Sequence, residues 1–186
     1  DFADLVAAAA DQPSLWRLQF LTSHPKFFTD KMITKLSQVR RLGSYLHVPA
    51  QSGSNDVLGR MHRGYTREHY LALVDALRAA NPRVSVSTDI IVGFPGESDA
   101  DFEQSMSLVD AVRFSQLFGF AYSPRPRTPA ARYDGRLDHS VAAHRLERLF
   151  ALQTSVQLEL NQRLIGTRVE VLVDGPARRG ASQWQG

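Results

Sequence analysis

Apolar residues along the chain follow two spacings, one typical of amphipathic helices and one typical of buried strands. The helix-like segments carry apolar residues three and four positions apart, whereas the strand-like segments are short runs of β-branched and aromatic residues. In chain order, the pattern predicts a helix over 2–10, a strand over 16–22, a helix after Thr29, a strand over 45–49, a helix after Thr66, a strand over 84–92, a helix after Ser98 that continues through Val112, a strand over 116–122 and a long helix over 139–164. Strands that alternate with helices predict an α/β fold built of parallel β/α units, either an open sheet or a barrel.

The pattern changes after Gly166. Residues 167–173 alternate polar and apolar side chains, which is typical of an antiparallel strand with one exposed face, and a turn follows at 174–176. We therefore predict two units, an α/β unit over residues 1–165 and the start of a small all-β module over residues 166–186.

In parallel sheets, ligands bind beyond the carboxyl ends of the strands. The segment after strand 45–49 offers Gln51 and Ser52, whose side chains both donate and accept hydrogen bonds, and Gly53, which allows close approach of the backbone. From the residues alone, a loop that binds a ribose or an amino-acid head group and a loop that merely closes the strand are equally supported.

Asp89 lies within the apolar strand 84–92, and a buried carboxylate requires a specific partner, such as a pair of ribose hydroxyls. The strand ends at Gly93-Phe94-Pro95-Gly96, which matches neither the dinucleotide-binding Gly-x-Gly-x-x-Gly pattern nor a phosphate loop. Nucleoside triphosphates are therefore disfavoured as ligands.

The segment after strand 116–122 contains three prolines and two arginines, Arg125 and Arg127. Prolines stiffen the backbone and arginines bind phosphates, so this segment suits the wall of a site for a phosphate-bearing partner, although a rigid connector to the last helix would look the same. Arg63, which lies after the second predicted strand, is a candidate for holding a carboxylate or a phosphate.

Charge and composition narrow the partners further. The 186 residues carry a net charge of +3, but residues 1–112 are at −2 and residues 113–186 at +5, with arginine as the sole basic residue type of the second part. This distribution makes a nucleic-acid partner worth considering, but a solvated arginine-rich surface explains the charge at least as well. Cysteine is absent, so the chain offers no thiolate ligands, and we expect no metal bound by its own residues.

No apolar run is long enough to cross a bilayer and no export signal is visible, which predicts a cytoplasmic protein without a membrane partner. The missing initiator methionine suggests a piece of a longer chain.

Four segments, in this order at strand ends, resemble the methylthiotransferases of the radical S-adenosylmethionine superfamily, and most of all the tRNA 2-methylthio-N6-dimethylallyladenosine synthases. They are Thr22-Ser23-His24-Pro25, His47-Val48-Pro49-Ala50-Gln51-Ser52-Gly53-Ser54, Asp89-Ile90-Ile91-Val92-Gly93-Phe94-Pro95-Gly96-Glu97 and Tyr122-Ser123-Pro124-Arg125-Pro126-Arg127-Thr128-Pro129. The resemblance covers roughly residues 16–175. At Arg127 the chain departs from the family, which usually has glycine there.

The resemblance implies the last four β/α units of an open (β/α)6 barrel, followed by the start of an RNA-binding TRAM module. It also implies S-adenosylmethionine and two [4Fe-4S] clusters as cofactors, with cluster cysteines that lie outside this chain. Gln51 and Asp89 would contact the ribose of S-adenosylmethionine, with Ser52 as a neighbour. Arg63 would meet its carboxylate, and Ile91 and Gly93 would line its adenine. We assign Arg125 and Arg127 to the tRNA side on charge and position.

The implied function is methylthiolation of carbon 2 of N6-isopentenyladenosine next to the tRNA anticodon. A radical formed from S-adenosylmethionine would abstract hydrogen from that carbon, the second cluster would deliver sulfur, and a second S-adenosylmethionine would supply the methyl group. Two alternatives stay open, namely methylthiolation of a ribosomal-protein aspartate by the related enzyme and a fragment with only a structural or RNA-binding role. We expect a monomer whose partner is tRNA, and the sulfur donor is unknown.

Overall fold

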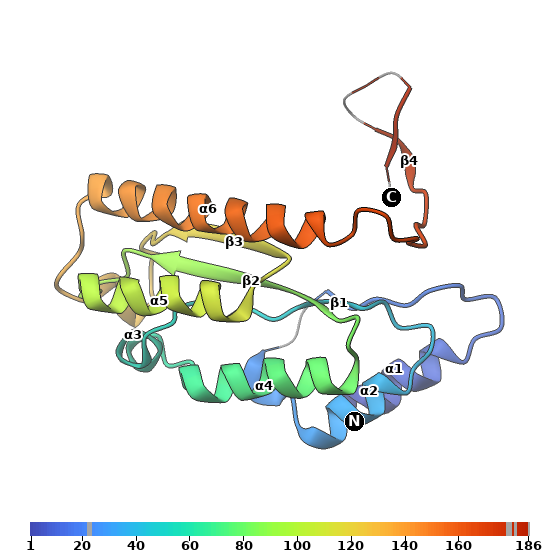
Figure 1. Cartoon of the computed structure of the whole chain (residues 1–186). Helices are drawn as coiled ribbons and strands as arrows, with labels where there is room; N and C mark the ends of the chain where they lie inside the picture. Colours follow the sequence, from blue (N-terminus) through green and yellow to red (C-terminus); the bar gives the residue numbers. More distant parts are fainter. Residues whose placement is uncertain (22–23, 178–179, 181, 186) are drawn as a thin grey trace.

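The computed structural model describes residues 1–21, 24–177, 180 and 182–185. Its elements are α1 (Phe2–Ala10), η1 (Pro25–Phe27), α2 (Asp30–Ser37), β1 (Tyr45–His47), α3 (Asn55–Arg60), α4 (Arg67–Ala80), β2 (Ser85–Val92), α5 (Asp99–Val112), β3 (Gln116–Ala121), η2 (Pro129–Arg132), α6 (His139–Gln162), β4 (Gly175–Pro176) and β5 (Trp184–Gln185). Figure 1 shows β2 and β3 side by side, with α6 running along β3.

The central sheet contains β1, β2 and β3 in sequence order, and both pairs of neighbours are parallel. His47 of β1 pairs with Ser87 of β2, and β2 pairs with β3 from Ser87 opposite Gln116 to Val92 opposite Ala121. The predicted α/β fold with parallel units is therefore confirmed. The three strands do not close on themselves, as expected for part of a barrel.

The two faces of the sheet have different surroundings. Leu46, Val86 and Ile90 are buried in one apolar core together with residues of α4, α5 and α6. On the other face Phe118 and Phe120 of β3 are 40% and 51% exposed. Strand residues alternate between the two faces, so the polar residues of β2 that do not enter the helix-covered core lie on this open face.

The predicted helix starts are confirmed. The side chain of Thr29 accepts a hydrogen bond from the amide of Met32 at the start of α2, and Thr66 caps α4 in the same way. Ser98 and Asp101 form a complete capping box at the start of α5. The short helix α3 was not predicted from the sequence, although Ser54 caps it through the amide of Val57.

The predicted strand over 16–22 is wrong for the described part of that segment. Leu18 forms one isolated parallel bridge with Leu42, through the amides of Leu18 and Gly43. Trp16 and Leu21 are 77% and 91% exposed. A strand requires a partner with a continuous row of free backbone groups, and the turn after α2 offers only this short contact. Thr22 and Ser23 lie outside the described residues.

The predicted antiparallel strand over 167–173 is also wrong. These residues form no ladder, and Val169, Val171 and Val173 are each more than half exposed. An alternating segment becomes a strand when another strand pairs with it, and the described residues provide none there. A two-residue antiparallel pair, β4 with β5, follows it. The division at residue 165 stays a prediction. Among the described residues, no helix is long and apolar enough to cross a membrane.

Candidate functional site

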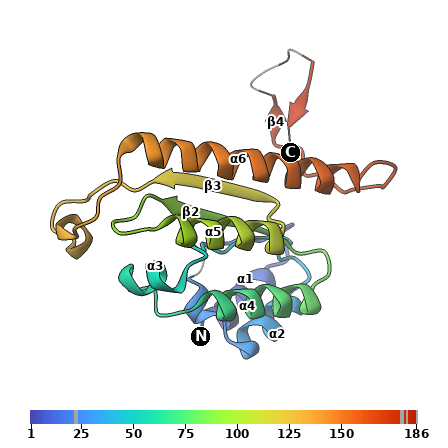
Figure 2. The same ribbon diagram turned by 60° about the vertical axis from the view of Figure 1, so that its left-hand side comes forward.

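A cavity of about 650 Å³ lies beyond the carboxyl ends of the parallel strands. Figure 2 shows β2 and β3 pointing toward the same end of the molecule, where the loop after β3 projects. Of the predicted site residues, the structure brings together Gln51, Arg63, Asp89, Ile91 and Arg125 on the lining of this cavity. Ser52, Gly93 and Arg127 are not on its lining.

Gln51 lies at the cavity in an unusual backbone conformation. Its φ of 67° is in the left-handed region, which is costly for a residue with a side chain. The backbone is held there because the Gln51 amide donates to the carbonyl of Asp89 at 2.8 Å and the Gln51 carbonyl accepts from the amide of Ile91 at 2.9 Å. These two hydrogen bonds fix the backbone of Gln51 against β2, and Gln51 and Asp89 both line the cavity. Strained residues of this kind cluster at functional sites.

Asp89 is less buried than the sequence predicts. Its side chain is 27% exposed, because it lies on the open face of the sheet and not among the apolar residues that flank it. The sequence also predicted a specific partner, and the structure provides one within the chain. Asp89 Oδ2 lies 3.4 Å from His47 Nε2. The sequence pattern does not single out His47, and it is the pairing of His47 with Ser87 that places it next to β2.

The residues after Gln51 hold helix α5 against the sheet. The buried Ser52 hydroxyl lies 3.3 Å from the Ser105 hydroxyl, which also accepts a hydrogen bond from the Gly53 amide at 2.9 Å. The Ser54 hydroxyl donates to Asp101. A Cβ atom on Gly53 would lie 2.3 Å from the carbonyl oxygen of Gln104, so only glycine fits. Ser52 therefore contributes to packing between the loop and α5, and only Gln51 of this segment reaches the cavity.

The carboxylate of Asp101 links the start of helix α5 to the segment that follows Gln51. Its oxygens accept hydrogen bonds from Ser54, from the Ser98 hydroxyl at 2.6 Å and from the Ser98 amide at 2.9 Å. Burial raises the pKa of Asp101, but these hydrogen bonds and the charge of Arg60 outweigh it and hold the pKa below its usual value. The start of α5 is thereby fixed relative to the segment that carries Gln51.

The turn that follows β2 is held in place by a buried ion pair between Glu97 and Arg145. Gly93 and Gly96 both have positive φ, which glycine adopts without strain. Glu97 Oε2 accepts a hydrogen bond from the Gly93 amide at 2.6 Å and lies 2.5 Å from Arg145 Nη1 on α6. The Glu97 side chain is fully buried. Burial raises the pKa of Glu97, and the Gly93 amide and Arg145 oppose that shift. Gly93 is thus part of the support of the cavity wall.

Aromatic side chains form the opposite part of the cavity lining. Phe94 packs edge-on against Tyr122, with ring centroids 5.1 Å apart, and against Tyr133 at 6.2 Å. Tyr133 also donates to the carbonyl of Arg60 at 3.5 Å. This arrangement offers flat apolar surfaces of the kind that accept a planar ring.

Three cavity residues carry buried polar atoms without a hydrogen-bond partner among the described residues. These atoms are Nε of Arg63, Nε and Nη2 of Arg60 and the hydroxyl of Tyr122. An unpaired buried donor costs on the order of 1–3 kcal/mol, so such groups indicate a ligand that supplies acceptors. The donor set therefore fits a ligand with a carboxylate, hydroxyl groups and a planar base.

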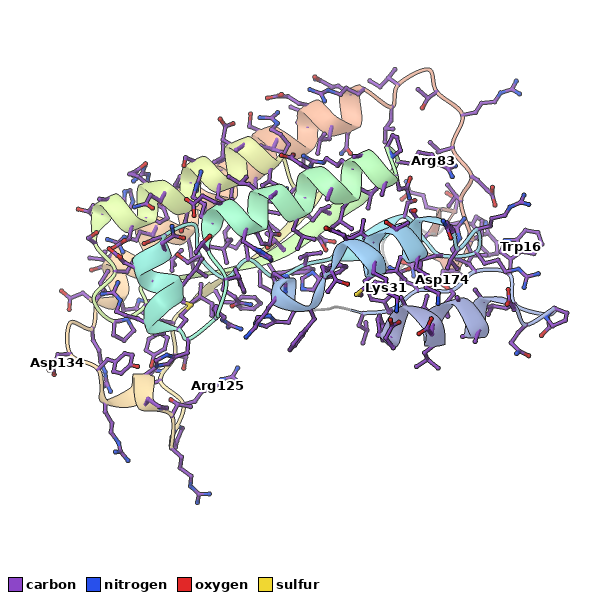
Figure 3. The ribbon with its side chains drawn as sticks, turned by 90° about the horizontal axis from the view of Figure 1, so that it is seen from below. Trp16, Lys31, Arg83, Arg125, Asp134 and Asp174 are labelled. Atoms are coloured by element: carbon purple, nitrogen blue, oxygen red, sulfur yellow. The ribbon has the colours of Figure 1, made fainter. Side chains whose placement is uncertain are left out.

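The loop after β3 covers the cavity from one side. Arg125, Thr128 and Pro129 line the cavity, and the Gly135 carbonyl accepts a hydrogen bond from the Gly96 amide at 2.7 Å. Arg127 has a φ of 68°, which explains in physical terms why glycine suits this position. Figure 3 shows Arg125 and Asp134 at the end of the molecule opposite Trp16 and Asp174.

The described residues do not form a metal site. They contain no group of three histidine, cysteine, aspartate or glutamate side chains that could hold a metal ion. His24, which precedes the 3-10 turn η1, accepts a hydrogen bond from the Lys26 amide at 3.3 Å and packs against Tyr65. Together with the absence of cysteine from the sequence, this means that the residues of this chain do not fit an iron–sulfur cluster.

Comparison with known proteins identifies the family. The family model described as the radical SAM superfamily matches residues 1–109. The chain belongs to the radical SAM superfamily. A solved radical SAM enzyme, coproporphyrinogen III oxidase from Escherichia coli, superposes with a TM-score of 0.63 at 18% identity, over 75% of this chain and 32% of that protein. At this identity the likeness concerns the fold alone, and it agrees with a partial barrel.

Curated relatives match this radical SAM chain over its full length. The tRNA-2-methylthio-N(6)-dimethylallyladenosine synthase of Moorella thermoacetica is 46% identical over 186 residues, which are 100% of this chain and 42% of that protein. The enzyme of the same name from Frankia alni is 46% identical over 179 residues, which are 96% of this chain and 36% of that protein. The chain thus spans about two fifths of the length of the curated relatives it matches.

Proposed function

We propose that the protein to which this radical SAM chain belongs methylthiolates carbon 2 of N6-isopentenyladenosine next to the anticodon of tRNA. The observation that carries the proposal is the identity of 46% along the whole chain to a synthase whose name states this product. The cavity at the strand ends supports it, because its lining combines polar, cationic and aromatic side chains as an adenosyl amino acid requires.

In this proposal the cavity holds S-adenosylmethionine. Asp89 and Gln51, which are linked through their backbones, accept and donate hydrogen bonds at the ribose hydroxyls. Arg63 pairs its free guanidinium donor with the ligand carboxylate. Ile91 contacts the adenine, and Gly93 supports that wall through its hydrogen bond to Glu97.

The bound cofactor supplies the reactive species with which substrate hydrogen is removed, while the protein binds, orients and shields it. This chain's residues contribute the binding and the shielding. The aromatic residues Phe94, Tyr122 and Tyr133 exclude water from one side of the cavity. Ligands for the two proposed [4Fe-4S] clusters would be cysteines outside this chain, since the chain has none.

The tRNA side of the proposed site is the loop after β3. Arg125 and Arg127 are exposed there, beside the cavity, and both can contact phosphates. RNA recognition by extruded bases requires a cavity that a base can enter from a surface of this charge. We further propose that the protein acts in the cytoplasm, as a monomer, on tRNA.

The test uses the complete protein, reconstituted without oxygen, and tRNA from cells that lack this modification. Mass spectrometry of the digested tRNA is expected to reveal the 2-methylthio nucleoside. Unmodified tRNA together with a methylthiolated ribosomal-protein aspartate would overturn the tRNA assignment in favour of the related enzyme. Failure of the protein to bind S-adenosylhomocysteine in calorimetric titration would overturn the assignment of the cavity.

A further inference from the structure

Three polar side chains meet on the open face of the sheet, away from the helix-covered core. His47 lies on β1 and Ser87 and Asp89 lie on β2, and the register of the two strands pairs His47 with Ser87. His47 Nδ1 is 2.9 Å from Ser87 Oγ, and His47 Nε2 is 3.4 Å from Asp89 Oδ2. The imidazole therefore bridges a buried hydroxyl and a carboxylate of the cavity.

The surroundings of His47 fix the orientation of its ring. Ser87 is fully buried, so its hydroxyl has little freedom to find another partner. On the other side, the ring packs edge-on against Phe118 of β3, with centroids 5.9 Å apart. When the Ser87 hydroxyl donates to Nδ1, the proton of the neutral imidazole is on Nε2 and faces Asp89. The His47 side chain is only 17% exposed, which limits competition from water.

We propose that His47 is a positioning residue for Asp89. Its Nε2 proton holds Oδ2 of Asp89, which leaves the other carboxylate oxygen to accept a hydrogen bond from a ligand hydroxyl. This inference rests on the proposed function, because it takes the ribose of S-adenosylmethionine as the ligand of Asp89. It adds a residue that acts through Asp89 and does not line the cavity itself.

A double-mutant cycle in the complete protein tests this role, with calorimetric binding of S-adenosylhomocysteine as the readout. His47→Phe keeps a ring of similar size but removes the hydrogen bond to Ser87 and the polar contact with Asp89, and we expect binding to weaken roughly fivefold, the effect of about one ordinary hydrogen bond. His47→Gln retains an amide donor toward Asp89, and we expect it to restore most of the affinity. In the Asp89→Ala background, His47→Phe is expected to cause no further loss.

Tyr45→Phe is the matched control. Tyr45 lies on the same strand and face as His47, two residues away, and its hydroxyl donates to Gln116 Oε1 at 3.1 Å. Its loss removes one hydrogen bond between strands without touching Asp89, so unchanged affinity is expected. Thermal unfolding of each variant shows that the protein remains folded.

The outcomes separate this inference from the proposed function. Equal losses from His47→Phe in the presence and absence of the Asp89 carboxylate would show a merely structural role and overturn the inference. The same conclusion follows if Asp89→Ala weakens binding while His47→Phe does not, and in that case the cavity assignment stands. No binding by the wild-type protein would overturn both.

Discussion

The two segments that border the cavity after β2 and after β3 are held in different ways. On the β2 side, residues 89–98, the turn is attached through Glu97 to Arg145, whose side chain is only 5% exposed. On the β3 side, residues 123–136, the loop is attached through the hydrogen bond between Gly96 and Gly135 and through the ring of Tyr133. Its arginines are largely exposed.

Arginine thus has a different role on the β2 side of the cavity than on the β3 side. Arg145 is desolvated and fixed by carboxylates, so its contribution is to the fold. Arg125 points its charge toward solvent beside the cavity, where it remains available to a partner. The rigid side suits a small cofactor that needs fixed geometry, and the exposed side suits a large polyanion.

The largest effect is expected from a substitution that removes the buried ion pair on the β2 side of the cavity. Arg145→Ala leaves the Glu97 carboxylate buried without its guanidinium, and we expect the free energy of unfolding to fall by about 3–5 kcal/mol. Denaturant titration measures it. The matched control is Arg148→Ala, on the same helix and also over the ring of Phe102, but with a 41% exposed side chain and an exposed partner, Glu103. We expect about 0–1 kcal/mol for the control, and similar losses for both variants would contradict the comparison.

Asp89→Ala tests the cofactor role of the rigid side. Removal of a carboxylate that accepts ligand hydrogen bonds should weaken binding of S-adenosylhomocysteine by about 1.5–3 kcal/mol while the fold survives. Gln51→Ala should act in the same direction but less strongly. Calorimetric titration of the complete protein decides this, with Asp134→Ala, an exposed carboxylate on the β3 side, as the control. Unchanged affinity in folded Asp89→Ala would remove the ribose role.

Arg125→Ala and Arg127→Ala test the exposed side. Each should lower affinity for tRNA, and each lost phosphate contact should reduce the slope of log affinity against log salt by about 1. Binding of S-adenosylhomocysteine should change little. Arg83→Ala, which Figure 3 places at the far end of the molecule, is the matched control and should leave tRNA binding intact. Loss of the small ligand with an unaltered salt slope would reverse the assignment.

The smallest effect concerns the backbone of the same loop. Arg127→Gly removes the strain of a left-handed φ of 68° and should stabilise the protein by up to about 1 kcal/mol. Arg132→Gly, in η2 of the same loop, replaces a residue whose φ is not positive and should instead lower stability. Thermal unfolding of both variants compares them. A destabilised Arg127→Gly would mean that the arginine side chain outweighs the backbone strain.

Local signals in the sequence predicted most helices and the central strands. The capping residues lie within four positions of the helix start that they stabilise, so the sequence alone reveals them. They are Thr29, Thr66 and the Ser98–Asp101 pair. The strand over 16–22 could not be predicted correctly, because its outcome depends on whether a partner strand lies beside it.

For the same reason, the residues of the site could be predicted only in part from the sequence. Position after a strand was enough to indicate Gln51 and Arg125, and a carboxylate within an apolar strand was enough to indicate Asp89. Nothing local shows that Gln51 adopts a positive φ, because the cause is its pairing with β2. The link from Glu97 to Arg145 joins residues 48 positions apart and appears only once α6 has packed.

The close approach at Gly53 has a consequence for variation among related sequences. A single added methyl group there would meet the backbone of α5, which cannot yield as a side chain would. Moving α5 would shift the turn that precedes it, and with it the cavity wall beyond Glu97. Gly53 is therefore expected to tolerate no substitution even though it does not line the cavity, whereas Gln51, two residues earlier, would be constrained by the proposed ligand contact. A short motif can thus combine two independent constraints, and mutational scanning would separate them by whether folding or only binding is lost.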